Sequence, residues 1–260
     1  MGKAEDNLDG INIVSMREGP QVTNEQREFL VALILEDEIF KALKSIEDLK
    51  APGLNGFGDN FFKTTWSIVK KDVIAVVMEF FYDEKIYSAI NINSTLVTLI
   101  PKHPTTKTIK EYRPISCCTT IFKIISKILT TGLSRVIGSI VNHSQAAFVP
   151  GQHIHDHILL AYELIRGYSR KGGTPKCMLQ LDLQKANERV DWHVLQHILR
   201  EIWLPTQFIW WIMLGVTSVS YKFNIHGRYT GFMRARRGLR QGDSVSPLLF
   251  VVLMEYMHKT

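Results

Sequence analysis

A single carboxylate, Asp182, stands near the end of an apolar run at 176–183, within the stretch LQLDLQKANERVDW (179–192). The run is predicted to form a strand. A carboxylate at the end of a strand lies at the margin of a sheet, where its charge must face water, a cation or a partner. Capping of the next helix is the plainer alternative for a lone aspartate. Binding of a divalent metal is the chemical alternative.

Basic residues and a glycine turn elsewhere in the chain favour the metal alternative. Lys102 and Arg113 lie in LIPKHPTTKTIKEYRPIS, and Gln241 and Gly242 lie in GLRQGD. A metal-holding aspartate, basic groups for phosphates and a glycine turn for close backbone approach are the parts of a phosphoryl-transfer site. Lys102 and Arg113 alone would be ordinary surface charges, so the hypothesis depends on the combination.

Arginines gather beside the glycine turn, in RARRGLR (234–240). The cluster consists of Arg234, Arg236, Arg237 and Arg240. Such a density of positive charge predicts a contact with the phosphates of a nucleic acid. The whole chain has 31 Lys and Arg against 25 Asp and Glu, a net charge of +6, which permits a polyanionic partner without requiring one.

Two other segments offer weaker alternatives. HIHDH (153–157) places His153 and His157 four residues apart, as in some metal sites, but the start of a helix explains the segment more simply. The aromatic residues of WLPTQFIWWIM (203–213) are predicted to fill the core and not to stack on bases.

Hydrophobic periodicity and turn residues predict the elements that position these residues. A capping box of Thr23 and Gln26 begins a predicted helix that runs on through FLVALILEDEIFKALKSI (29–46), with Leu35 on its apolar face. Further helices are predicted around 62–80, 121–141, 156–171, 189–201, 206–218 and 248–257. A strand is predicted at 94–102, a loop at 107–116, and a β-hairpin at 218–238 with its turn near Gly227. The order predicts an α+β protein.

Composition limits the class of protein. At 260 residues and 45% apolar content, the chain can bury a sizeable core. Its polar start lacks the apolar stretch of a signal peptide, and its apolar runs are too short to span a bilayer. Cys117, Cys118 and Cys177 lack the spacing of a zinc site. A soluble, intracellular protein with reduced thiols is therefore expected, with no membrane partner.

Taken together, the motifs resemble the reverse transcriptases of non-LTR (LINE-type) retrotransposons, in the form common in plant genomes. The matching runs are KAPGLNGF, TLVTLIPK, YRPISCCTTIFKIISKILTTGL, QAAFVPGQHIHDHILLAYELI, LQLDLQKANERVDW and GRYTGFMRARRGLRQGDSVSPLLFVVLMEYM. They follow the order and spacing of the family over about residues 35–260. The resemblance implies a right-hand polymerase fold, with a flexible lead-in at 1–22, fingers at 23–150, a partial palm at 151–260 and no thumb.

The resemblance also implies the roles of individual residues. Asp182 would be the first metal-binding aspartate, holding Mg²⁺ with help from the carbonyl of Leu183. Lys102 and Arg113 would hold the triphosphate of an incoming dNTP, and Arg suits this because its planar fork grips two oxygens. The implied partners are an RNA template and a DNA primer.

Residues that lie against the nucleotide are implied in the same way, with some departures from the family. Gln241 and Gly242 would form the loop beside the nucleotide and the template base. Asn187 stands where the family has an aromatic residue that excludes a ribose 2′-hydroxyl, and an amide can hydrogen-bond that hydroxyl instead. Glu188 replaces an aspartate, and Ser244 replaces the proline usual after RQGD.

A further departure concerns the second catalytic element of the family, a Y/F-A-D-D hairpin. No Ala-Asp-Asp run occurs in the 260 residues, and two-metal catalysis needs several carboxylates. Two alternatives follow: a fragment of a reverse transcriptase domain, or a truncated, inactive derivative with at most weak, non-specific binding of RNA or DNA. The last predicted helix is apolar nearly all round, so one exposed side and self-association through it are expected.

Overall fold

The computed structural model describes residues 17, 19–48, 50–82, 92–142, 145, 148–166, 183–225 and 227–259. Asp182 and Cys177 lie outside these residues, as do most of the predicted strand at 176–183 and most of the predicted lead-in at 1–22. Val22, at the end of that lead-in, is buried, and its backbone N–H donates to Ile202 O at 3.1 Å.

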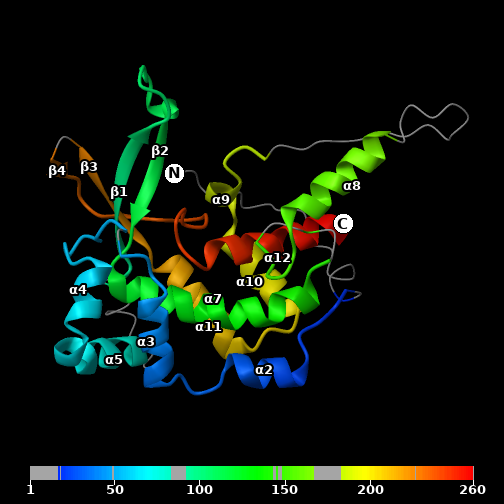
Figure 1. The fold of residues 1–260 in the computed structure, drawn as a ribbon, viewed down its shortest axis with the longest axis horizontal. Helices are drawn as coiled ribbons and strands as arrows, with labels where there is room; N and C mark the ends of the chain where they lie inside the picture. The colour runs from blue at the N-terminus through cyan, green and yellow to red at the C-terminus, as the bar shows by residue number, and fades with distance from the viewer. Residues whose placement is uncertain are drawn as a thin grey trace, which may run out of the picture.

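The described chain combines helices with one mixed sheet, in agreement with the predicted α+β class (Figure 1). The helices are α2 (Asn24–Leu30), α3 (Glu36–Lys44), α4 (Asp59–Thr64), α5 (Trp66–Tyr82), η1 (Ile109–Glu111), α7 (Thr120–Ile140), α8 (Ile154–Arg166), α9 (Ala186–Arg189), α10 (Trp192–Glu201), α11 (Thr206–Thr217) and α12 (Ser246–Lys259). The strands are β1 (Ser94–Pro101), β2 (Tyr112–Cys117), β3 (Ser220–Ile225), β4 (Arg228–Tyr229) and β5 (Met233–Arg234). No described helix is long and apolar enough to cross a membrane.

The sheet joins segments that lie far apart in the sequence. Its order is β2-β1-β3-β4, and β5 pairs with β3 beyond the end of β4. β1 is antiparallel to β2 and parallel to β3. Figure 1 shows β1 and β2 rising away from the helices, with β3 beside the base of β1.

Side chains alternate between the two faces of this sheet, which we call the inner and the outer face. Val97 pairs with Ser116 and Phe223, so these residues share the inner face. Leu96 pairs with Cys117 and Lys222, so these residues share the outer face. The register extends the inner face to Pro114 and Tyr221, and the outer face to Thr98, Arg113, Ile115 and Arg234.

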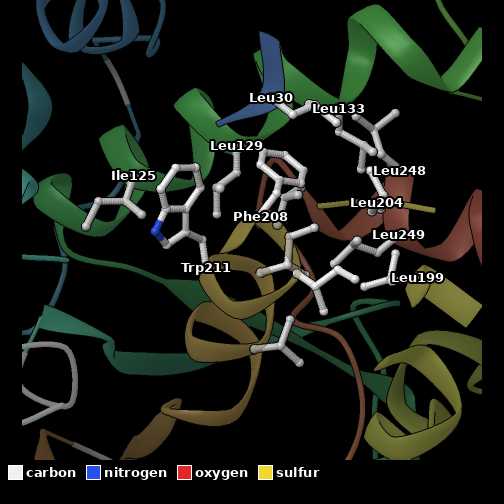
Figure 2. Close-up of a cluster of buried hydrophobic side chains, with 14 of the residues drawn as sticks. Leu30, Ile125, Leu129, Leu133, Leu199, Leu204, Phe208, Trp211, Leu248 and Leu249 are labelled. Atoms are coloured by element: carbon white, nitrogen blue, oxygen red, sulfur yellow. The ribbon is translucent and has the colours of Figure 1, made fainter. Parts of the chain in front are cut away.

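The hydrophobic core lies around α7 and α11 (Figure 2). Trp211 is 1% exposed, its ring meets Phe81 edge to face at 5.0 Å, and its indole N–H donates to Phe81 O at 2.8 Å. Burial of such a ring stabilises the fold by about 1.5–3 kcal/mol. The predicted core role of 203–213 is thus confirmed for Trp211 and Phe208, whereas Trp203 and Trp210 are exposed.

The predicted continuous helix through 23–46 is wrong. The capping box of Thr23 and Gln26 is present, but α2 ends at Leu30 and α3 begins at Glu36. The N–H of Leu35 donates to the Glu38 carboxylate at 3.1 Å, and three acidic residues in the first turn of α3 favour a new helix start there. Leu35 is consequently 55% exposed and does not belong to the core face.

The loop predicted at 107–116 is also wrong in part, because 112–117 form β2. Pro114 is unusual within a strand, since proline cannot donate a backbone hydrogen bond. The structure accommodates it because β2 is the edge strand of the sheet, where a missing donor faces outward. The predicted strand at 94–102 and the hairpin around Gly227 are confirmed by β1 and by β3 paired with β4.

The last helix, α12, includes the predicted range 248–257 and begins at Ser246, but its predicted exposure is wrong. Leu248, Leu249, Val251 and Val252 are buried, and no described side chain of the helix at 246–256 is exposed. α12 packs against α7 and α10, and its buried Glu255 accepts from Asn142 N at 2.9 Å. Self-association through this helix stays a prediction, to which the described side chains at 246–256 give no support.

The glycine-rich loop at 50–60 is fixed against the start of α7. A Cβ on Gly53 would lie 2.6 Å from the backbone nitrogen of Thr119, so the contact requires glycine. Asp59 is fully buried and pairs with Lys123 Nζ at 2.7 Å, while Thr120 Oγ1 donates to it at 2.8 Å. This pairing holds the loop beside Cys117 and Cys118, where β2 leads into α7.

Candidate functional site

A cavity of about 460 Å³ lies between the inner face of the sheet, α9 and the arginine-rich segment that precedes the glycine turn. Its walls include Val97, Pro114, Ser116, Tyr221 and Phe223 from the sheet, Lys185, Glu188 and Arg189 from the α9 region, and Ala235, Arg236, Arg237, Gly238, Leu239 and Gln241. The size suits a small ligand. The cavity is the place where several of the predicted site segments meet.

Backbone hydrogen bonds join the α9 region to the arginine-rich segment. Gly238 N donates to Val190 O and Leu239 N to Asn187 O, both at 2.7 Å, and the indole N–H of Trp192 donates to Gly238 O at 2.8 Å. Gly238 has φ +92°, and a Cβ there would lie 2.8 Å from Glu188 O. Only glycine permits this close approach, so Gly238 fixes the distance between two walls of the cavity.

Asn187 lies on α9, next to the cavity-lining Glu188. Its side-chain oxygen Oδ1 is buried and has no hydrogen-bond partner among the residues that the structure describes. Asn187 is not among the residues that line the cavity, so its contact with a nucleotide stays a prediction. Asp191 caps α10 instead of facing the cavity, because its Oδ1 accepts from His193 N at 2.8 Å and from Val194 N at 3.2 Å.

Gln241 and Gly242 form the turn predicted from the sequence. Gln241 is exposed and lines the cavity, and Gly242 has φ +88°, a conformation that favours glycine. The turn is held on α7, since Ser126 Oγ donates to the Asp243 carboxylate and accepts from Val245 N at 3.2 Å. A ligand in the cavity would therefore meet Gln241 on a supported turn.

Arg240 does not belong to the nucleic-acid surface that the sequence predicted, because it is only 6% exposed. Its guanidinium donates to Cys118 Sγ at 2.9 Å and to Asn93 Oδ1, and it stacks over Phe122 at 4.4 Å. Burial works against its charge, but Cys118, Asp243 and Tyr221 more than offset this, so the pKa of Arg240 is raised and the group stays charged. These contacts hold Arg240, and with it the start of the turn at 241–242, in the protein interior.

The other three arginines of the cluster lie where a polyanion can reach them. Arg236 is exposed and Arg237 is half-buried, and both line the cavity. Arg234 is exposed on β5, opposite Ser220, and by register lies on the outer face of the sheet. The cluster predicted as one contact surface is thus divided between the cavity, the outer face and the interior.

Lys102 and Arg113 are brought together, but away from the cavity. Arg113 pairs with Ile100, and Lys102 N donates to Glu111 O at 2.9 Å, so both basic residues lie at the distal end of the β1–β2 hairpin. Both are exposed, and the Lys102 ammonium donates to Lys110 O at 3.1 Å. Alternation places Arg113 on the outer face, opposite to its cavity-lining neighbours Pro114 and Ser116.

The predicted metal site cannot be assembled from the described residues alone. Asp182 lies outside them, and Leu183, at their edge, is 42% exposed. Within the described ranges no three His, Cys, Asp or Glu side chains are grouped to hold a metal. His153 is exposed at the start of α8, and the side chain of His157 is outside the described part.

Sequence reasoning missed the two aromatic residues that line the inner wall, Tyr221 and Phe223. Burial raises the pKa of the Tyr221 hydroxyl, although the nearby Arg240 lowers it. The period of two in VSYKFNI predicts that both rings share one face of a strand. Nothing in that pattern says that this face borders a cavity.

Comparisons with known proteins agree on one family. Residues 100–260 match the family model described as "Reverse transcriptase (RNA-dependent DNA polymerase)". The chain is 29% identical over 236 residues to the "Transposon TX1 uncharacterized 149 kDa protein" of Xenopus laevis, which covers 91% of this chain and 18% of that protein.

Two further relatives are Pol polyproteins of retrotransposable elements. The "Retrovirus-related Pol polyprotein from type-2 retrotransposable element R2DM" of Drosophila melanogaster is 26% identical over 62% of this chain and 15% of its own length. The "Retrovirus-related Pol polyprotein from type-1 retrotransposable element R2" of Nasonia vitripennis is 27% identical over 60% of this chain and 15% of its own length. The chain spans less than a fifth of the length of these relatives.

Proposed function

Because the chain belongs to the reverse transcriptase (RNA-dependent DNA polymerase) family, we propose that its cavity receives an incoming nucleotide paired with a template base. The observation that carries this proposal is the convergence of α9, the inner sheet face and the Gln241–Gly242 turn on one cavity. The resemblance to non-LTR retrotransposon enzymes is confirmed by the transposon relatives. None of the three organisms is a plant, so the plant-like form stays a prediction.

Charge and shape around the cavity support a nucleotide as the occupant. Tyr221 and Phe223 offer aromatic surface for a base, while Arg236 and Arg237 offer positive charge for phosphates. Gln241 can face the base pair from its supported turn. The proposed contact of Asn187 with the sugar rests on the family role, since Asn187 does not line the cavity in the described structure.

Lys102 and Arg113 enter the proposal as a second basic group. The family role, contact with the triphosphate, requires the tip of the β1–β2 hairpin to lie over the cavity when a nucleotide is bound. Arg236 and Arg237 are nearer to the proposed occupant in the described structure, because they line the cavity and Lys102 and Arg113 do not.

The family generally uses a divalent metal, and Mg²⁺ is the proposed ion. Asp182 and the carbonyl of Leu183 are its proposed ligands on this chain, immediately before the α9 region. We assign no chemical step to the ion, since the described residues do not form its site by themselves.

Subdomain roles follow from the family in the same way. Residues 23–150 are proposed as fingers and 151–260 as part of a palm. The pairing of β1 with β3 means that these two parts share one sheet. RNA template, DNA primer and dNTP are the proposed partners.

The second candidate function is binding of nucleic acid without catalysis. It is supported by Arg234 and Arg236, which are exposed and can contact phosphates without a metal ion. Primer extension with Mg²⁺ on an RNA template separates the two candidates. Incorporation that is abolished by Asp182→Ala supports the enzyme, whereas template binding with no incorporation supports the second candidate.

The nucleotide assignment is tested through sugar selection at Asn187. With template-primer present, dATP and ATP are titrated against the wild-type chain and Asn187→Phe. The ring should weaken ATP binding relative to dATP by about tenfold, because it removes an acceptor for the 2′-hydroxyl and fills its space. Asn142→Phe, at an exposed position in the described structure, serves as the control. Equal ratios for the wild-type chain and Asn187→Phe would refute the assignment of Asn187.

A further inference from the structure

Two aromatic rings project from the outer face of the sheet into solvent. Tyr229 is 57% exposed and Phe232 is 56% exposed. The Lys222 ammonium lies over both rings, 5.8 Å from the centre of Tyr229 and 4.5 Å from the centre of Phe232. Exposure of two aromatic rings to water is unfavourable. The pair of rings around the Lys222 ammonium is therefore a candidate binding surface.

An irregularity in the strands aims Phe232 outward. Tyr221 pairs with Met233, and two residues further along β3 the carbonyl of Phe223 accepts from Thr230 N at 3.0 Å. Between these two pairs, β3 moves on by two residues, from 221 to 223. The segment opposite moves on by three residues, from 230 to 233. The extra residue makes a β-bulge opposite Lys222, and a bulge re-aims the side chain that it carries.

The positive charge of the surrounding segment indicates what kind of ligand would bind to these rings. The stretch 202–242 contains six Lys and Arg and no Asp or Glu. Lys222 and Arg234 lie on the outer face beside the rings, and Arg113 lies on the same face two strands away. Aromatic rings set among cations without a single carboxylate in the segment match the faces and phosphates of a single nucleic-acid strand.

We propose that the outer face formed by Lys222, Tyr229, Phe232 and Arg234 is a stacking site for unpaired bases of a single-stranded RNA or DNA. The rings stack on bases, and the cations contact the phosphates between them. This site rests on the proposed function, where it holds the template strand on the side of the sheet opposite to the nucleotide cavity. It differs from the arginine contacts predicted from the sequence because it needs unpaired bases.

The test measures binding by fluorescence anisotropy, with a labelled oligouridylate of about 20 nucleotides and a blunt RNA duplex of the same length. Tyr229→Leu and Phe232→Leu keep apolar bulk but remove the ring. Each should weaken binding of the single strand about tenfold and change binding of the duplex less than about twofold. Their thermal midpoints should match the wild-type protein, since both rings are more than half exposed.

Two matched variants control for removal of an aromatic ring elsewhere. Phe29→Leu removes a ring that also carries a cation, Arg135, at 4.6 Å, and Tyr162→Leu removes a ring that is 64% exposed on α8. Neither should change the affinity for the single strand.

The outcomes separate this inference from the proposed function. If the Tyr229 and Phe232 variants bind the single strand as the wild type does, while Arg236→Ala and Arg237→Ala together weaken it, the stacking site is refuted and the proposed function stands. If neither set has an effect, both fail. If the aromatic variants change only the sedimentation of the protein, the face is a protein interface and the stacking site is refuted.

Discussion

The inner and outer faces of the sheet are built from neighbouring residues of the same strand, yet they present different surfaces. On β3, Tyr221 and Phe223 turn inward to a cavity, while Lys222 between them turns outward to two exposed rings. The inner face borders the cavity beside α9 and the turn at 241–242, and the outer face carries the exposed rings of Tyr229 and Phe232. One strand therefore contributes both to the proposed nucleotide cavity and to the proposed stacking surface.

The arginine-rich segment at 234–240 also contains a buried and an exposed arginine within seven residues. Arg240 is buried under the turn with Cys118, Asn93 and Phe122, whereas Arg234 is exposed on the outer face. Residue type alone would give both the same role. Changes at buried positions of this segment should alter stability, and changes at its exposed positions should alter binding.

The largest effect is expected from Arg240→Met. The substitution leaves Asn93 Oδ1 and Cys118 Sγ without their buried partner, and it should lower the free energy of unfolding by about 3 kcal/mol. Urea denaturation measures this. Arg234→Met, in the same segment but exposed, should change the free energy of unfolding by less than about 0.5 kcal/mol. Equal effects of the two variants would contradict the burial of Arg240.

Gly238→Ala should come next. Its Cβ would meet Glu188 O at 2.8 Å in a backbone conformation that disfavours side chains, so the free energy of unfolding should fall by about 2 kcal/mol. The control is Gly231→Ala on the outer bulge, where a Cβ meets nothing within 4 Å. A Gly238→Ala protein as stable as Gly231→Ala would show that the packing between α9 and the arginine-rich segment is loose.

Replacing Arg234, Arg236 and Arg237 together by Ala should have the smallest effect on the free energy of unfolding. The triple variant should instead change the salt dependence of nucleic-acid binding. Removing one arginine that binds a phosphate should flatten the dependence of log K on log salt by roughly 0.7–0.9, so the three together should flatten it by about two to three units. A parallel triple variant at exposed cations elsewhere, Arg27, Lys71 and Arg200, should leave the slope unchanged. An equal change in the salt slope for the two triple variants would mean that binding depends on net charge alone.

Local patterns predicted much of the fold, and tertiary packing explains where they failed. The capping box at Thr23, the strand at 94–102 and the long helix at 121–141 depend on neighbours in the sequence, and all are present. Leu35 was assigned to a core face because its spacing fits a helix. The break at 31–35 instead depends on contacts outside that spacing, including Ile34 N donating to the Tyr82 hydroxyl at 2.9 Å.

The candidate site was predictable only in part for the same reason. The glycine turn at 242 is visible in the sequence because positive φ selects glycine. The burial of Arg240 is not visible, since Asn93 and Cys118 lie more than a hundred residues away in the chain. The outward position of Arg113 follows from strand register, which a loop prediction for 107–116 does not give.

Photo-crosslinking tests the central assignment, a nucleotide in the cavity of the inner face, most directly. The protein is irradiated with 8-azido-dATP in the presence of template-primer and Mg²⁺, and the labelled peptides are mapped. We predict labels in 183–189, 221–223 or 235–242 that unlabelled dATP removes by competition. Labelling confined to the outer face at 229–234, or labelling that dATP does not reduce, would contradict the assignment.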